Sequence, residues 1–523
     1  MTSHATLPRL ARTGLMVAVI VVTGVGLYAW QLDRLYLVHD EVIYALNAHA
    51  IATTWRDLSG QFLPISFPVV GTFFATPMNI YFTALFLKGA PLSEVVVRLP
   101  SVAVGVACIV LVFQIGRRVF KRDSLALLAA GMLALTPAHF IHSRLGTDHL
   151  YTVVLMLAWL LCLLTVETER QVWRIGIATA FLGLGVYSYL GALITMPVCF
   201  VLTTVALYWQ GFRSPRSYLA AAAGFMLPMV PFLVWHATHP DQFARQVQMY
   251  GLYDSARLSP TEGARELASQ ASVAGRVAVF WDYFSPSFLF FAGDTGLING
   301  TRFTGVFLWP MMVLLPAGVC RIITQHRTTA GRLLLLGLLT SPLAATLVAE
   351  RYRINRALVM LPLAALVATA GVEMLLAARA RVWRLAAVVL IAVMPFQFAR
   401  FYQDYFNDYP SRSYSWFEYN IRGGMEDLIA RQDTSPSPVF IATNIQWADY
   451  YWPFYLAKHG RRDLQARTTY VDVSSPGFEG LMPSGSLLLC RTADAAAAVA
   501  AGFVQLRSIG EPDGSQSFVV LQR

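Results

Sequence analysis

Two adjacent carboxylates, Asp40 and Glu41, stand ten residues after Trp30, where the first long apolar run of the chain ends. A positioned carboxylate can act as a general base that takes a proton from a substrate hydroxyl. The pair also has a structural interpretation. Aspartate is a good helix N-cap, worth about 1 kcal/mol, and glutamate is favourable in a first helical turn. Both interpretations stay open, because a capping carboxylate can still face a cleft.

A third carboxylate, Asp148, lies in the short segment "HSRLGTDHLY" (142–151) between two apolar runs. Its neighbours there include His142, Arg144 and His149. Asp148 either belongs to a site with the first acidic pair or caps a helix that follows it. For the two histidines we prefer a role as anchors at an apolar–water boundary.

Three arginines, Arg351, Arg353 and Arg356, crowd the start of another apolar run in "RYRINRALVMLPL" (351–363). Guanidinium groups bind phosphate through paired hydrogen bonds, so the cluster indicates an anion site. Arg302 and Arg144 are further candidates for the same phosphate. The alternative is that the arginine side chains reach from an apolar surface to water.

The elements that must position these residues are membrane helices. The chain has 523 residues, of which 56% are hydrophobic and 13% charged, and its mean hydropathy is +0.53. A soluble domain carries about 25% charged residues. Eleven apolar stretches are long enough to span a bilayer, and 77–90 is a shorter twelfth candidate: 13–31, 95–116, 124–140, 150–166, 173–190, 192–209, 217–236, 303–320, 332–349, 357–378 and 383–399. The fold class predicted is an all-α polytopic membrane protein with about 11–13 transmembrane helices.

The basic residues give an orientation. With Arg9 and Arg12 in the cytoplasm, every short loop predicted on that side is basic: 117–122, 170–174, 213–216, 321–332 and 379–384. This is the positive-inside pattern, and it explains the net charge of +10 without a nucleic-acid partner. The loops 32–94 and 237–302, the acidic positions and the 351–356 arginines then all face the extracytoplasmic side.

The sequence divides into three predicted parts. Residues 1–400 form the transmembrane domain, and 401–420 is an aromatic segment that suits the membrane–water interface. Residues 421–523 have the composition of a small soluble α/β domain, with strands expected at 439–442, 486–490, 504–509 and 517–521 and helices at 446–458 and 493–501. This C-terminal domain would be extracytoplasmic.

The apolar helices hold almost no ionisable residues near their centres, which disfavours an ion-driven transporter. The five cysteines show neither a disulfide framework nor metal-ligand spacing. The sequence predicts no dedicated metal site. A divalent cation at the Asp40–Glu41 pair stays open, since carboxylates bind such ions.

Carboxylates and arginines on one membrane face favour one reaction class. A carboxylate deprotonates an acceptor hydroxyl, the hydroxyl attacks a lipid-phosphate sugar, and arginines stabilise the phosphate that leaves. Two alternatives remain: a lipid or polysaccharide transporter or flippase, and a non-catalytic envelope assembly protein that docks through residues 421–523.

At this point the sequence resembles the membrane glycosyltransferases of the GT-C fold, specifically family 39, which includes protein O-mannosyltransferases and lipid A aminoarabinose transferases. The resemblance covers residues 1–400 in order and rests on five short motifs: "HDE" (39–41), "VVVRLPSVAVG" (95–105), "SRLGTDHLY", "YFSPSFLFFAGD" (283–294) and "RYRINRALVMLPL".

The resemblance implies that Asp40 is the catalytic base, that Glu41 supports it and that Asp148 is the second acidic position. It implies a polyprenyl-phosphate sugar as donor, an acceptor lipid, protein or glycan, and a place in the bacterial inner membrane. One departure concerns a lysine–proline pair that helps to hold the donor phosphate in the aminoarabinose transferases. Thr76–Pro77 stands in the matching area here, so the arginines would hold the phosphate.

Overall fold

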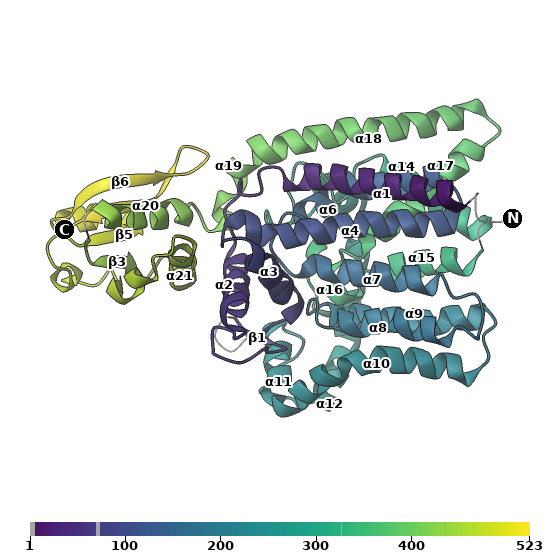
Figure 1. Ribbon diagram of the computed structural model, residues 1–523, viewed down its shortest axis with the longest axis horizontal. Helices are drawn as coiled ribbons and strands as arrows, with labels where there is room; N and C mark the ends of the chain where they lie inside the picture. Colours follow the sequence, from purple (N-terminus) through teal and green to yellow (C-terminus); the bar gives the residue numbers. More distant parts are fainter. Residues whose placement is uncertain (1–5, 70–73, 326, 435) are drawn as a thin grey trace. The chain divides into compact units, whose positions relative to one another are not determined.

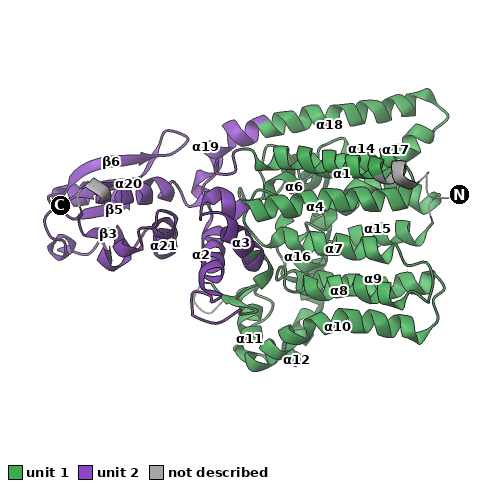
Figure 2. Ribbon diagram, in the orientation of Figure 1, with its two compact units in different colours: residues 1–30, 64–79, 99–402 green, residues 31–63, 80–98, 403–523 purple. Residues whose placement is uncertain are grey.

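The computed structural model describes residues 6–69, 74–325, 327–434 and 436–523. The chain forms two compact units, each built from several segments (Figure 2). Unit 1 contains residues 1–30, 64–79 and 99–402, and unit 2 contains residues 31–63, 80–98 and 403–523.

Apolar helices make up most of the structure. Seven helical spans in the described residues are long and apolar enough to cross a membrane: Ala11–Ala29 within α1 (Thr6–Ala29), α4 (Glu94–Phe120), α9 (Ala192–Trp209), α10 (Pro215–Thr238), Thr329–Leu347, α17 (Met360–Ala377) and α18 (Arg381–Asn407). Four shorter apolar helices accompany them: α5 (Asp123–Ala134), α7 (His149–Leu163), α8 (Val172–Gly185) and α14 (Met311–Thr324). Together they fall on the eleven predicted stretches, so the prediction of a polytopic helical membrane protein is confirmed.

Two of the predicted stretches are interrupted close to a proline. The stretch 124–140 ends as α5 at Ala134, and the separate short helix α6 (Pro137–His142) follows. The stretch 332–349 is likewise divided into α15 (Thr329–Thr340) and α16 (Leu343–Leu347), with Pro342 between them. Proline lacks the N–H that a continuous helix needs and clashes with the preceding turn.

Long helices of unit 1 run alongside one another, and α8, α9 and α10 lie side by side (Figure 1). Small residues permit the closest approach, between α14 and α17. A Cβ atom at Gly318 would stand 1.8 Å from the carbonyl oxygen of Val367, and one at Gly371 would stand 2.1 Å from that of Leu314. Such close backbone contact is typical of helix pairs in membranes.

The remaining elements of unit 1 are short. They are the antiparallel pair β1 (Phe67–Pro68) and β2 (Phe74–Ala75), the helices α11 (Pro240–Met249), α12 (Pro260–Leu267) and α13 (Gln270–Asp282), the π-helix η1 (Ser287–Ala292) and the 3-10 turn η2 (Ile354–Arg356). The arginine-rich segment therefore has almost no regular structure of its own before α17 begins.

A five-stranded sheet organises unit 2. The strand order is β4-β3-β5-β7-β6, where β4, β3 and β5 are parallel and β7 and β6 are antiparallel additions: β3 (Val439–Ala442), β4 (Thr468–Val471), β5 (Leu487–Arg491), β6 (Val504–Gly510) and β7 (Gln516–Gln522). Helices of the same C-terminal region are α19 (Tyr409–Ser413), α20 (Ile421–Thr434), α21 (Ala448–Lys458) and α22 (Ala495–Ala500), with 3-10 turns η3 (Tyr414–Phe417), η4 (Arg462–Arg467), η5 (Phe478–Leu481) and η6 (Thr492–Asp494). The predicted small α/β region is confirmed, and β4 is an additional strand.

The hydrophobic core of unit 2 contains residues from both the N-terminal and the C-terminal parts of the chain. Leu37 and, on α2 (His39–Thr54), Val42 and Leu46 are buried in the same cluster as residues of the sheet and of α21. The hydroxyl of Tyr451 on α21 donates to the carbonyl oxygen of Leu37 at 2.6 Å, across a separation of 414 residues. The helix that begins with "HDE" is therefore part of the C-terminal core. The short helix α3 (Pro77–Gly89) follows it in the sequence.

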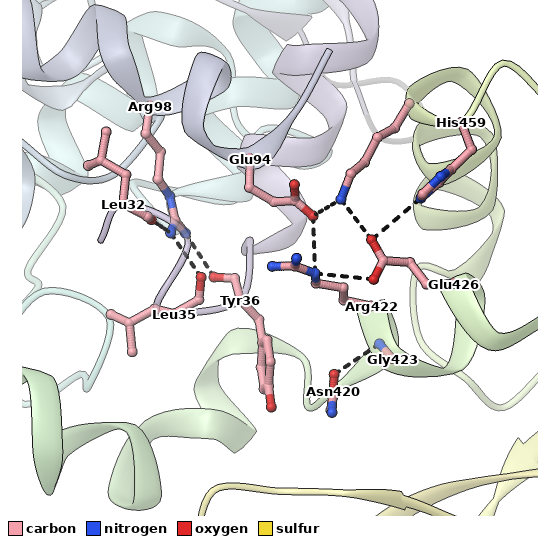
Figure 3. Close-up of polar contacts among 11 residues, drawn as sticks. Leu32, Leu35, Tyr36, Glu94, Arg98, Asn420, Arg422, Gly423, Glu426 and His459 are labelled. Atoms are coloured by element: carbon pink, nitrogen blue, oxygen red, sulfur yellow. Dashed lines mark hydrogen bonds and ion pairs between the residues drawn. The ribbon is translucent and has the colours of Figure 1, made fainter. Parts of the chain in front are cut away.

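A partly buried ionic network around the buried Glu94 adds to this core (Figure 3). Glu94, at the start of α4, accepts a hydrogen bond from Lys458 Nζ at 2.8 Å, and Arg422 Nε lies 3.5 Å from the same carboxylate. Lys458 also donates to Glu426 at 2.7 Å, and His459 stands 3.5 Å from that carboxylate. The network joins α20, α21 and the N-terminal end of α4.

We expect Lys458→Met to lower the free energy of unfolding by about 2 kcal/mol, because hydrogen bonds to charged groups contribute roughly 1.5–3 kcal/mol and Glu94 and Glu426 would each lose one such bond. Thermal unfolding of the purified protein in detergent measures this effect. Arg461→Met is the matched control, since its partner Asp463 is exposed and such pairs contribute about 0–1 kcal/mol. Equal effects of the two substitutions would contradict a stabilising role for the network.

Candidate active site

Glu41 is fully buried and forms a two-bond ion pair with Arg98. Arg98 Nε donates to Glu41 Oε1 and Nη2 donates to Oε2, both at 2.7 Å. Glu41 Oε2 also accepts the backbone N–H of Val38 at 3.0 Å, the N-cap residue of α2. Glu41, and not Asp40, is thus the carboxylate that caps the helix.

The remaining donors of Arg98 hold the chain that leads to the acidic pair (Figure 3). Nη1 donates to the carbonyl oxygens of Leu32 and Leu35, at 2.6 and 2.9 Å, and Nη2 donates to that of Tyr36 at 2.8 Å. With the two bonds to Glu41, all five guanidinium N–H groups have an acceptor. One buried arginine therefore fixes the segment 32–41.

Asp40 stands in the first turn of α2, with its side chain 50% exposed. Its Oδ1 lies 3.3 Å from His39 Nε2. The surrounding protein raises the pKa of Asp40 by desolvation; His39 opposes the rise, and the charges of Glu41 and Glu418 add to it. The first turn of α2 thus presents the accessible carboxylate of Asp40, whose pKa is raised. Its neighbour Glu41 is held in place by Arg98.

His39 has three neighbours in unit 2. Besides Asp40, its Nδ1 donates to Glu418 Oε1 at 3.2 Å. Its ring stacks on the indole of Trp447, with centroids 4.8 Å apart and planes within 12° of parallel. Burial opposes a charge on His39, but the hydrogen bond with Glu418 and the charges of Asp40 and Glu418 outweigh it and raise the pKa of the imidazole.

Glu418 and Trp447 both have left-handed backbone conformations, with φ of 59° and 61°. This conformation is uncommon for residues with a Cβ and costs of order 1–3 kcal/mol. They are two of the ten described non-glycine residues with positive φ, and both contact His39.

In unit 1, Asp148 takes the N-cap position of α7 but does not cap it through its side chain. Its Oδ2 instead accepts a hydrogen bond from the Thr76 hydroxyl at 3.0 Å, and this hydroxyl also approaches the carbonyl oxygen of Ser188 at 3.2 Å. Thr76 belongs to the Thr76–Pro77 pair at the start of α3. The segment that precedes α3 and the second acidic position are therefore directly linked.

Burial argues against the expected interfacial role for His142, while that role stays a prediction for His149. His142 is buried inside unit 1 and His149 is half-buried, with their ring centroids 5.8 Å apart. His149 Nε2 lies 3.3 Å from Asn355 Nδ2, on the arginine-rich segment. The segments 142–149 and 351–356 are thus neighbours, which periodicity alone did not indicate.

Each of the three clustered arginines has a carboxylate partner. Arg356 forms a two-bond pair with Glu350 at 2.8 and 3.0 Å and donates to the Tyr189 hydroxyl at 2.6 Å. Arg351 lies 3.3 Å from Asp282, and Arg353 lies 3.6 Å from Asp294. An anion at this cluster must therefore bind through the N–H groups that these carboxylates do not use. Arg351 has the most exposed side chain of the three, at 55%, and Arg356 has the least exposed, at 12%.

Asp294, which ends the motif "YFSPSFLFFAGD", was not singled out as a site residue. It is buried, and its two oxygens accept the backbone N–H groups of Gly296 at 2.7 Å and Ile354 at 2.6 Å. Burial raises the pKa of Asp294 to about 6, although the two N–H groups and Arg353 act in the opposite direction. Asp294 thereby fixes the backbone that carries the arginines.

A small pocket lies beside this segment. Its lining includes His149, Tyr189, Asn355 and Arg356. The Asn355 side-chain oxygen is buried and has no hydrogen-bond partner among the described residues. Cationic, aromatic and amide groups therefore meet at one cavity of unit 1.

The two other arginines predicted for the phosphate have separate surroundings. Arg302 is exposed and contacts the carbonyl oxygen of Thr295. Arg144 is buried, and its Nη1 donates to the carbonyl oxygens of Tyr28 and Trp30 at 2.6 and 2.7 Å. These bonds tie Arg144 to the C-terminal end of α1.

Comparison with known proteins gives one matching family and several similar solved structures. Residues 75–235 match the family described as dolichyl-phosphate-mannose-protein mannosyltransferase. ArnT from Cupriavidus metallidurans bound to undecaprenyl phosphate is a similar solved structure, with a TM-score of 0.55, 14% identity, and coverage of 96% of this chain and 97% of that chain. The apo state of the same ArnT aligns with a TM-score of 0.54 at 15% identity, covering 98% of each chain.

The archaeal oligosaccharyltransferase AglB from Archaeoglobus fulgidus, in complex with an inhibitory peptide and a dolichol-phosphate, aligns with a TM-score of 0.52 at 15% identity. The alignment covers 86% of this chain and 64% of AglB. No curated protein sequence matches the chain. The chain has the GT-C fold.

The GT-C fold expected from the sequence is thereby confirmed for this multi-span membrane protein. Within the described part of this GT-C chain, no group of three or more His, Cys, Asp or Glu side chains is arranged to hold a metal ion. Glu41 directs both oxygens to Arg98. A divalent cation would therefore have to rely on Asp40 without a second carboxylate from Glu41.

Sequence reasoning missed four site residues of this GT-C protein. Arg98 and His39 contact the predicted Glu41 and Asp40, and Glu418 and Trp447 contact His39. For Arg98 a signal existed, because an arginine four residues into an apolar helix needs a buried anionic partner. His39 stands in the quoted "HDE" motif. Glu418 and Trp447 lie 379 and 408 residues beyond His39, and no local pattern connects them with α2.

Proposed function

We propose that the protein is a glycosyltransferase that moves a sugar from a polyprenyl-phosphate donor to an acceptor hydroxyl at the extracytoplasmic face of the bacterial inner membrane. The observation that carries this proposal is the GT-C fold, shared over nearly the whole chain with an ArnT structure that contains undecaprenyl phosphate. An accessible carboxylate at a fixed position, Asp40, supplies the group that such a transfer requires.

Asp40 is the proposed base. It takes the proton of the acceptor hydroxyl while the acceptor oxygen forms a bond to the anomeric carbon of the sugar. The bond from that carbon to the phosphate oxygen breaks, and the electron pair leaves with the polyprenyl phosphate. A single displacement of this kind inverts the anomeric configuration. Glu41 is the proposed support of Asp40, because it fixes the helix turn on which Asp40 stands.

The donor phosphate is assigned to the arginines of unit 1. Arg356 lines the cavity together with His149 and Tyr189, and Arg351 is the most exposed member of the cluster. Guanidinium groups stabilise the negative charge that develops on the leaving phosphate. Arg353 and Arg302 are the further proposed ligands, Arg144 is proposed to act from its buried position, and Asp148 is proposed to shape the site through Thr76.

The proposed orientation follows from the basic loops, with a cytoplasmic N-terminus and an extracytoplasmic C-terminal region. The acceptor class comprises lipids, proteins and glycans that carry a free hydroxyl. No nucleic-acid partner is proposed, since the positive charge belongs to the cytoplasmic loops.

A panel of polyprenyl-phosphate sugars tests the function directly. The purified protein in detergent is incubated with each donor, with and without an envelope extract as acceptor, and free polyprenyl phosphate is quantified by mass spectrometry. We expect acceptor-dependent release with at least one donor. Folded protein that neither releases polyprenyl phosphate from any donor nor retains any donor in native mass spectrometry would refute a transferase.

A further inference from the structure

We infer that the C-terminal part of the chain completes the catalytic site, by supplying Glu418 and Trp447 to hold His39 as the positioning residue of Asp40. The inference rests on the proposed function of Asp40 and adds a role for three residues outside it. All four residues lie in unit 2.

The contacts around His39 leave its ring little freedom. Its Nδ1 donates to Glu418 at 3.2 Å, its face stacks on Trp447 at 4.8 Å between centroids, and its Nε2 lies 3.3 Å from Asp40 Oδ1. A hydrogen bond fixes the edge of the ring while stacking fixes its plane. The second nitrogen is thereby aimed at the carboxylate of Asp40.

The backbone supports this arrangement from two separate turns. Glu418 follows the 3-10 turn η3, and Trp447 is the residue immediately before α21. Both are in the left-handed region. Strained residues persist where the surrounding structure over-determines them, and they gather at functional sites. Here two residues with this conformation, from different turns, carry the side chains that contact one imidazole.

The charges explain what His39 does for Asp40. Two carboxylates, Asp40 and Glu418, face the ring from opposite nitrogens, so a proton on each nitrogen satisfies both. The third nearby carboxylate, Glu41, is directed to Arg98. Tyr451 donates its hydroxyl to Leu37, and burial raises the pKa of that phenol, so it stays neutral. The imidazolium is therefore the cation that orients Asp40 and keeps it ionised.

Activity then requires Asp40 ionised and His39 protonated, which gives a bell-shaped dependence of kcat/KM on pH. Glu418 raises the pKa of both groups. Glu418→Gln should move both limbs to lower pH, by about one unit for the loss of a charge at this distance. Glu418→Asp keeps the charge and should restore most of the wild-type profile, whereas His39→Gln should abolish the alkaline limb.

A second measurement does not depend on turnover. The histidine resonances of the full-length protein in detergent, assigned to His39 by comparison with His39→Gln, are titrated by NMR. We expect the pKa of His39 to fall by about one unit in Glu418→Gln and to stay unchanged in the control Glu479→Gln, which removes the same charge from η5.

The results separate the two proposals. An unchanged His39 titration in Glu418→Gln, or a pH profile identical to that of Glu479→Gln, would overturn the positioning role. Full turnover of Asp40→Asn would instead refute Asp40 as the base, whatever the titration shows. If Glu418→Gln does not fold, Glu418→Asp and His39→Gln decide, since a wild-type alkaline limb in His39→Gln contradicts the inference.

Discussion

Asp40→Asn is expected to reduce glycosyl transfer by about 10²- to 10⁴-fold, the contribution typical of a general base. Asparagine has nearly the same shape as aspartate but cannot accept the acceptor proton. The half-exposed position of Asp40 means that the fold does not depend on its charge. Donor binding and the unfolding temperature should therefore stay close to those of the wild type, which native mass spectrometry and thermal unfolding measure.

Asp33→Asn is the control for this experiment, because it removes a carboxylate from an exposed position seven residues before Asp40. It should leave the rate of polyprenyl phosphate release unchanged. A wild-type rate in folded Asp40→Asn, or an equal loss in both variants, would show that Asp40 is not the base.

Arg98→Met should have the largest effect on stability, about 3–5 kcal/mol, because removal of one partner leaves a buried charge uncompensated. Glu41 is fully buried, and three carbonyl groups of the segment 32–36 would lose their donor in the same substitution. We expect a lower unfolding temperature, faster proteolysis before α2, and reduced turnover because the turn that carries Asp40 loses its support.

Two further variants test whether the loss of stability in Arg98→Met comes from the broken Glu41–Arg98 pair. Arg118→Met, at an exposed position of the same helix, should stay within about 0.5 kcal/mol of the wild type. The double variant Glu41→Leu/Arg98→Met removes both charges and should recover part of the stability, since an ion pair can often be replaced by apolar residues. If the double variant is as unstable as the sum of the two single variants, Glu41 and Arg98 are not coupled.

Much of the fold was predictable because it depends on composition and local pattern. The eleven apolar stretches require only a bilayer-length run of nonpolar residues. In the C-terminal region, β3 matches its predicted range of 439–442, and β5, β6 and β7 match to within one residue at each end. The added strand β4 (Thr468–Val471) is only partly buried, so its sequence lacked the apolar run that marks a central strand.

The site was predictable only where a motif carries the chemistry. Asp40 and Glu41 were found together, but their different surroundings depend on one arginine 57 residues away, Arg98. The contact between His39 and Glu418 joins residues 379 positions apart. The arginines were found by their density, yet their carboxylate partners Asp282 and Asp294 precede them by about 60 to 70 residues. Local sequence patterns do not predict contacts between residues so far apart in the chain.

The shared core of α2 and the C-terminal sheet has a consequence for biosynthesis. Tyr451 and Leu37 are separated by 414 residues, and at roughly 5–20 residues per second the ribosome needs some 20–80 s to make that length. Throughout this time the helix that carries Asp40 has no core to pack against. If Asp40 is the base, as proposed, we expect a chain that ends before α21 to lack transferase activity, because the helix that carries Asp40 then has no C-terminal core to pack against.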